Sequence, residues 1–60
     1  MRFENDGRKM DATLYVKDGR ALVVMTWRDN GEEVGFREFA TMDEALQWLS
    51  AMKWDYKVAA

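Results

Sequence analysis

The chain has 60 residues, of which 9 are basic and 11 acidic, it contains neither cysteine nor histidine, and its formal net charge is -2. A chain this short buries only about 60% of the surface that its unfolded form exposes, and the missing residue types exclude disulfides and the usual zinc sites as supports for the fold. The interleaved charges give no indication of a polyanionic partner. We therefore expect one domain, residues 1–60.

The N-terminal segment from Arg2 to Asn5 precedes a turn-like pair, Asp6-Gly7. This segment could form a short extra strand, or it could fray. From residue 10 to residue 17, apolar and polar side chains alternate, which is typical of a strand with one buried face. The apolar positions of this strand are Met10, Ala12, Leu14 and Val16.

Two Asx-Gly pairs predict the turns of a β-meander. Asp18-Gly19 suits a two-residue type I′ hairpin, which places Lys17 opposite Arg20. Asn30-Gly31 predicts a second two-residue hairpin. The register of the second hairpin sets four pairs: Arg28 with Glu33, Trp27 with Val34, Met25 with Phe36, and Val24 with Arg37.

A helix start follows the third strand. Thr41 is placed to cap the helix, and Glu44 completes a capping box. Apolar residues from Met42 to Met52 follow helical spacing and predict a helix that lies on one face of the sheet. The expected core on that face is Leu14, Val16, Val23, Met25, Trp27, Val34 and Phe36. The predicted fold class is α+β: a three-stranded antiparallel β-meander, with or without the short N-terminal strand, packed against one C-terminal amphipathic helix.

The C-terminal segment from Trp54 to Val58 alternates like a strand. It could add to an edge of the sheet, cover the face opposite to the helix, or pair with another molecule. The sequence leaves these three alternatives open.

The sheet face opposite to the helix is predicted to be partly apolar. Tyr15, Leu22 and Val24 lie at its centre, and the polar and charged positions around them are Asp11, Lys17, Arg20, Arg28, Glu33 and Arg37, with Gly35 and Phe39 on the same side. An apolar centre with a polar rim is typical of a protein-binding patch. The predicted partner-binding residues are Tyr15, Leu22, Val24, Arg28, Arg37, Trp54 and Tyr56.

The order of the strands and the helix entry from Phe39 to Ala45 resemble the three-stranded-sheet-plus-helix DNA-binding domains of plant AP2 transcription factors and integrase arm-binding domains. The resemblance covers residues 12–52. In those families the sheet lies in the major groove of DNA, and its Arg and Trp side chains contact bases and phosphates. The resemblance implies that the nucleic-acid-binding residues are Arg20, Arg28 and Arg37.

This chain departs from that pattern at several positions. Glu33 lies beside Arg28, Asp11 is on the same face, Trp27 has core parity, and the total charge is acidic. Counterion release from DNA needs several unpaired cations. Nucleic-acid binding is therefore the alternative function.

Catalysis has little support in the sequence. Ser50 lies on the predicted helix without a base to activate it, and the neighbouring carboxylates Glu32-Glu33 and Asp43-Glu44 diverge. The segment 29–33 lacks the ligand spacing of a calcium loop, and a hairpin turn explains it better. We expect no enzyme, no catalytic residue, no cofactor and no metal site.

The sequence predicts a small non-enzymatic protein-interaction module that binds through the second sheet face and the aromatic tail. The partner is another protein or a second copy in a homodimer, and an inhibitor of a host protein from a phage or mobile element is one form of this prediction. No apolar stretch approaches the roughly 20 residues that span a bilayer, and the start of the chain lacks the apolar run of a secretory signal. We expect no membrane contact and a soluble, cytoplasmic protein.

Overall fold

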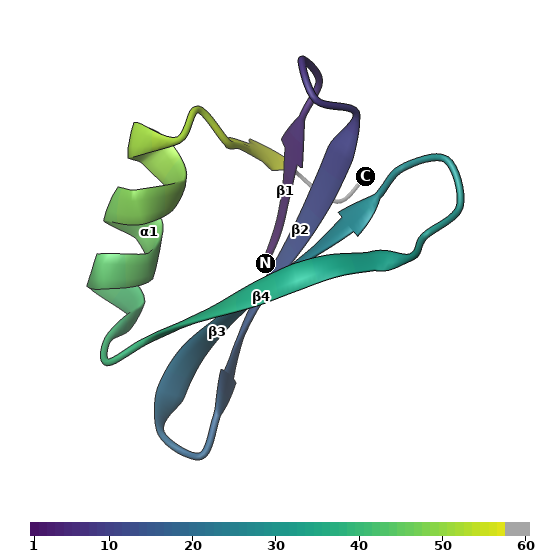
Figure 1. Ribbon diagram of the computed structural model, residues 1–60. Helices are drawn as coiled ribbons and strands as arrows, with labels where there is room; N and C mark the ends of the chain where they lie inside the picture. The colour runs from purple at the N-terminus through teal and green to yellow at the C-terminus, as the bar shows by residue number, and fades with distance from the viewer. Residues whose placement is uncertain (58–60) are drawn as a thin grey trace.

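The computed structural model describes residues 1–57 and has an α+β fold, in which one helix packs against an antiparallel sheet (Figure 1). The elements are β1 (Arg2–Asn5), β2 (Met10–Lys17), β3 (Arg20–Trp27), β4 (Glu33–Phe39), α1 (Met42–Ala51) and β5 (Asp55–Lys57). The order of the strands in the sheet is β4-β3-β2-β1-β5. Within the described residues, the predicted three-stranded meander is therefore one side of a five-stranded sheet, which β1 and β5 extend beyond β2.

The N-terminal segment forms a strand, β1, which pairs antiparallel with β2. The loop between them is stabilised by Asn5, whose side-chain Oδ1 accepts a hydrogen bond from the N–H of Arg8 at 3.1 Å. Lys9 closes the loop with a φ of 55°. Of the two alternatives for this segment, the added strand is the one observed.

The hairpin of β2 and β3 is confirmed residue by residue. Asp18 and Gly19 have φ angles of 53° and 75°, which is the conformation that a type I′ turn requires. Lys17 lies opposite Arg20, and the register continues without a slip to Met10 opposite Trp27. A local turn signal was sufficient to fix this pairing.

The second hairpin differs from the prediction because its loop is longer. The Trp27 N–H donates to the carbonyl oxygen of Glu32 at 2.9 Å, and the Gly31 N–H donates to the carbonyl oxygen of Trp27 at 2.9 Å. Trp27 therefore lies opposite Glu32, and residues 28–31 form the loop. A type I′ turn needs two positive φ angles, and here Gly31 adopts one whereas Asn30 does not. Instead, the Asn30 side chain accepts a hydrogen bond from the N–H of Glu32.

A β-bulge in β4 then exchanges the two faces of this strand. Thr26 pairs with Glu33, but Met25 pairs with Gly35, so that Val34 is the extra residue. Beyond the bulge, Val24 pairs with Phe36 and Val23 pairs with Arg37. Before the bulge the predicted pairs were wrong by two residues, which leaves each side chain on the predicted face. Beyond the bulge they were wrong by one residue, which moves each side chain to the opposite face.

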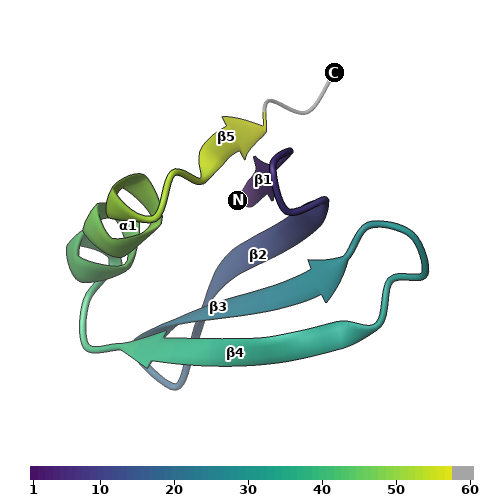
Figure 2. The same ribbon diagram turned by 45° about the horizontal axis from the view of Figure 1, so that its top comes forward.

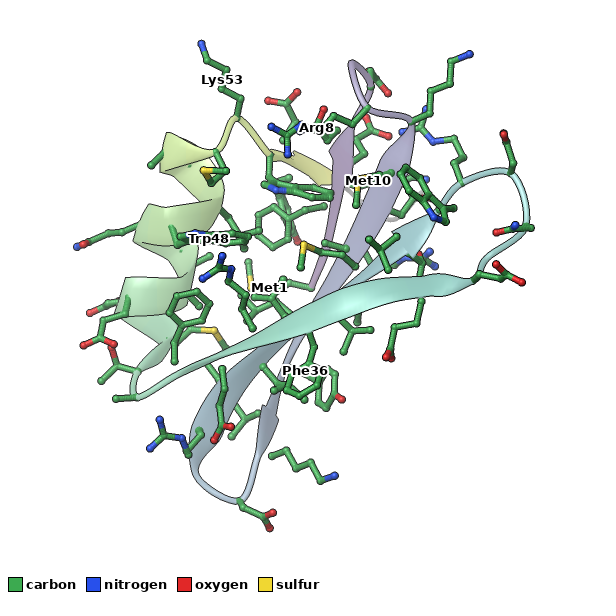
Figure 3. All side chains as sticks on the ribbon, viewed as in Figure 1. Met1, Arg8, Met10, Phe36, Trp48 and Lys53 are labelled. Atoms are coloured by element: carbon green, nitrogen blue, oxygen red, sulfur yellow. The ribbon has the colours of Figure 1, made fainter. Side chains whose placement is uncertain are left out.

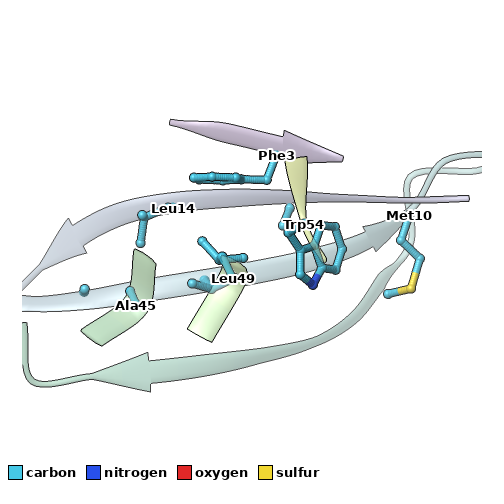
Figure 4. Close-up of a cluster of buried hydrophobic side chains, with 9 residues drawn as sticks. Phe3, Met10, Leu14, Ala45, Leu49 and Trp54 are labelled. Carbon is cyan, nitrogen blue, oxygen red and sulfur yellow. The ribbon is translucent and has the colours of Figure 1, made fainter. Parts of the chain in front are cut away.

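The helix begins as predicted. The Thr41 hydroxyl accepts a hydrogen bond from the N–H of Glu44 at 3.2 Å, and α1 lies over β3 and β4. Ala45 and Leu49 of α1 are buried against Leu14 and Val23 of the sheet (Figure 4). The complete buried cluster is Phe3, Met10, Ala12, Leu14, Ala21, Val23, Ala45, Leu49 and Trp54.

The end of the helix turns the chain back onto the sheet. Lys53 adopts a φ of 63°, its N–H donates to the carbonyl oxygen of Ser50, and the Trp54 N–H donates to the carbonyl oxygen of Leu49 at 2.9 Å. These two bonds define a Schellman motif. The motif buries Trp54 beside Leu49 in the core and delivers β5 to the free edge of β1 (Figure 2).

The C-terminal segment therefore adds to an edge of the sheet, which was one of the three alternatives. Tyr56 lies opposite Phe3, and their rings meet edge to face with centroids 5.6 Å apart. Val58, which the prediction included in this strand, lies outside the described residues.

Replacement of Lys53 by glycine should stabilise the protein by about 1 kcal/mol, because a residue with a Cβ atom is strained in the left-handed region whereas glycine is not. The measurement is urea unfolding followed by tryptophan fluorescence. Lys53→Ala is the matched control, since it removes the same charge but retains the Cβ atom. Equal stability of the glycine and alanine variants would contradict this account of the helix end.

Candidate interaction surface

The sheet has a face that α1 does not cover, which we call the open face. Register places on it the side chains of Tyr15 and Leu22, which are paired, and of Val24 and Phe36, which are paired. In Figure 3, Trp48 lies between α1 and the strands, whereas Phe36 lies on the other side of β4. Within residues 1–57, no helix or strand packs over this face.

Four apolar side chains gather at the centre of the open face: Tyr15, Leu22, Val24 and Phe36. We call them the open-face cluster. Phe36 is 61% exposed and Tyr15 is 40% exposed, while Leu22 and Val24 are half-buried between them. The cluster lines a shallow hollow of about 420 Å³, whose rim is formed by Lys17, Asp18, Arg20, Glu33 and Glu38.

The rim carries charges of both signs toward the β2–β3 turn, where Lys17, Asp18, Arg20 and Glu38 lie. Arg20 forms an ion pair with Glu38 through its Nε atom. Among the described residues, neither Lys17 nor Glu33 takes part in an ion pair. Lys17 lies at the end of the sheet next to the β2–β3 turn, and Glu33 lies at the end next to the β3–β4 loop.

Arg28 is surrounded by carboxylates, and it does not pair with Glu33 as the sequence suggested. Its guanidinium lies 3.0 Å from Asp6, 3.6 Å from Asp11 and 3.8 Å from Glu4. The hydrogen bond to Asp6, together with the charges of all three carboxylates, raises the pKa of Arg28 above its ordinary value. Arg28 therefore joins the β3–β4 loop to the N-terminal hairpin.

One oxygen of this group has no hydrogen bond. Oδ1 of Asp11 is enclosed, and no hydrogen-bond donor of the described residues reaches it. The distance of 3.6 Å to Arg28 is too long for a hydrogen bond but short enough for a charge interaction. The Asp11 carboxylate is therefore stabilised by the charge of Arg28.

Three of the predicted partner-binding residues do not lie on the open face. Arg37 is on the helix side, where its guanidinium carbon lies 5.2 Å from the centre of the Trp48 ring. Trp54 is 6% exposed and belongs to the core. Tyr56 is 55% exposed but shares the helix side with Phe3. These placements correct the predicted face of Arg37 and the exposure expected for Trp54.

Other residues lie on a different face from the one predicted, or are exposed where burial was predicted. Phe36 was expected in the core and lies on the open face, while Gly35 and Phe39 lie on the helix side. Val16, Trp27 and Val34 were expected in the core but are exposed. Tyr15, Leu22 and Val24 lie on the open face as predicted.

Two further features do not occur in residues 1–57. This part of the chain has no helix that is long and apolar enough to cross a membrane. It also has no group of three or more acidic, histidine or cysteine side chains arranged to hold a metal ion.

Comparisons with protein-family models, with curated proteins and with solved structures gave no match for this chain.

Replacement of Arg28 by glutamine should lower the melting temperature, because the carboxylates of Glu4, Asp6 and Asp11 would repel one another without a cation between them. The loss should shrink at high salt, which screens the repulsion. Arg8→Gln is the control, since Arg8 forms no ion pair among the described residues. The measurement is thermal unfolding by circular dichroism, and equal losses in both variants would contradict this role of Arg28.

Proposed function

We propose that this protein is a non-enzymatic interaction module that binds a protein surface through its open face. The observation that carries the proposal is the open-face cluster, in which four apolar side chains line a hollow that the described residues leave uncovered. Such a patch with charged residues around it is typical of a protein-binding surface.

The exposure of Phe36 is the strongest single support for a protein contact. An aromatic side chain that remains in water gains none of the free energy that burial would provide. Phe36 also lies at the centre of β4, with Leu22 and Val24 next to it on β3. Contact with an apolar side chain of another molecule would therefore bury a continuous surface.

Nucleic-acid binding is less well supported than a protein contact. Of its three candidate arginines, Arg37 is on the helix side, Arg28 is surrounded by carboxylates, and Arg20 is paired with Glu38. Binding to phosphates would have to break these ion pairs, and their cations would release few counterions. The hollow itself is lined by both Glu33 and Glu38, which would repel a polyanion.

The composition of the chain supports a non-enzymatic role. Histidine and cysteine are absent, and these are the residues that most often act as base or nucleophile near neutral pH. Inhibition of a host protein by a phage or mobile-element product is one biological setting in which a module of this kind would act.

The test is photo-crosslinking in cells that express the protein, with benzoylphenylalanine placed at position 36. The control places the same residue at position 16, because Val16 is also 61% exposed but lies on the helix side. We expect a discrete crosslinked protein product from position 36 and at most a weak one from position 16. Failure of position 36 to crosslink, or equal products from both positions, would contradict the proposed function.

A further inference from the structure

We propose that Asn30 is a site of spontaneous deamidation, and that the hydrogen bonds of the β3–β4 loop determine how fast this modification occurs. Asn30 and Gly31 are exposed, and they lie in the loop of residues 28–31 that joins the two strands. The site lies outside the open-face cluster and does not depend on the proposed function.

Deamidation at this pair converts asparagine and water into an acidic residue and ammonia. The Gly31 amide nitrogen loses its proton and attacks Cγ of Asn30, so that a new N–Cγ bond forms. The bond from Cγ to Nδ2 breaks, and Nδ2 leaves as ammonia. The product is a five-membered cyclic imide. Water then adds to one of the imide carbonyl carbons and breaks its bond to the nitrogen, which yields aspartate or isoaspartate at position 30.

The sequence around Asn30 provides what this reaction needs. A glycine after the asparagine places no side chain beside the attacking nitrogen. The space around Gly31 is also open, since no atom beyond its chain neighbours lies within 4 Å of the place that a Cβ atom would take. The attack by the nitrogen is therefore not hindered sterically.

Asn5, the other asparagine of the chain, lies in a less reactive position. It precedes Asp6, so the corresponding nitrogen carries a residue with a side chain. Asn5 is also buried, and its Oδ1 accepts a hydrogen bond from the N–H of Arg8. Asn30 is therefore the more reactive of the two asparagines.

The native loop opposes the reaction at both of the groups that react. The Gly31 N–H donates to the carbonyl oxygen of Trp27 at 2.9 Å, so the nitrogen that must lose its proton is held in a hydrogen bond. The Asn30 Oδ1 accepts a hydrogen bond from the N–H of Glu32 at 2.9 Å, which holds the carboxamide. Closure of the imide ring also requires a backbone conformation of Asn30 outside the main allowed regions. The loop must therefore open before Asn30 reacts.

Arg28 holds this loop closed. Its N–H donates to the carbonyl oxygen of Lys9 at 3.0 Å, and its guanidinium lies 3.0 Å from Asp6. Both contacts join the loop to the hairpin of β1 and β2. Because a loop opens less often when more contacts hold it, the rate of deamidation should depend on Arg28, although Arg28 takes no part in the reaction.

Either product changes the loop. Aspartate at position 30 adds a negative charge between Asp29 and Glu32. Isoaspartate lengthens the main chain by one carbon atom, and the hydrogen bond from Gly31 to Trp27 depends on the length of this segment. Modification of Asn30 is therefore expected to weaken the closed form of the loop.

The test compares the native wild-type chain with the same chain unfolded in urea, both in one mildly alkaline buffer. Trypsin releases the two asparagines in separate peptides, residues 29–37 and residues 3–8, and mass spectrometry follows their conversion with time. We expect the native chain to convert Asn30 about tenfold more slowly than the unfolded chain, because hydrogen bonds must break before the reaction. In the unfolded chain, Asn5 should react more slowly than Asn30.

Arg28→Gln tests the control by the loop. Its native form should convert Asn30 about threefold faster than the native wild type, as expected for the loss of an exposed ion pair. Arg8→Gln is the matched control and should convert Asn30 at the wild-type rate, since Arg8 forms no ion pair among the described residues. Circular dichroism establishes that each variant is folded, and the comparison of native and unfolded wild type does not depend on a variant.

Three results would overturn the inference. If the native and unfolded chains convert Asn30 at equal rates, the loop does not control the reaction. If Asn30 of the unfolded chain reacts no faster than Asn5, position 30 is not a preferred site. If folded Arg28→Gln reacts at the wild-type rate, Arg28 does not hold the loop closed.

Discussion

The bulge at Val34 determines which side chains of β4 face the helix and which face away. Without it, Phe36 would lie against α1 and Arg37 would lie beside Leu22. With it, Phe36 joins the open-face cluster, and Arg37 packs over the Trp48 ring on the helix side. Phe39 also packs on Trp48, with ring centroids 5.7 Å apart. The extra residue thus places Arg37 and Phe39 against Trp48 of the helix, and leaves the Phe36 ring exposed at the candidate interface.

The Schellman motif at the end of α1 has a similar effect on the C-terminal segment. It buries Trp54 and directs β5 to the edge of β1. The segment therefore extends the sheet, and within residues 1–57 it does not cover the open face. The two aromatic residues that the sequence assigned to a binding tail thus serve the helix side of the fold, and the candidate interface consists of β2, β3 and β4 alone.

The parts of the fold that could be predicted are those set by local sequence. Asp18-Gly19 fixes the first hairpin, and Thr41 fixes the helix start, because turn and cap chemistry depend on a few adjacent residues. The bulge depends on tertiary packing. Phe39 lies two residues before the helix cap at Thr41, and its contact with Trp48 determines which residues of β4 face the helix. The position of Phe39 relative to the helix cap was therefore a signal in the sequence from which the face of Phe36 could have been predicted. The helix end gave no signal, because Lys53 occupies the left-handed position where glycine is usual. Three of the four residues of the open-face cluster were therefore predicted, and Phe36 was not.

The bulge places Phe36 on the open face, and nuclear Overhauser effects measured in solution test this placement most directly. We expect contacts from the Phe36 ring protons to the methyl groups of Val24 and Leu22, and from the Arg37 side chain to the Trp48 ring. Contacts from the Phe36 ring to Met25 or Trp48 would show a regular strand without the bulge, and would contradict the candidate interface.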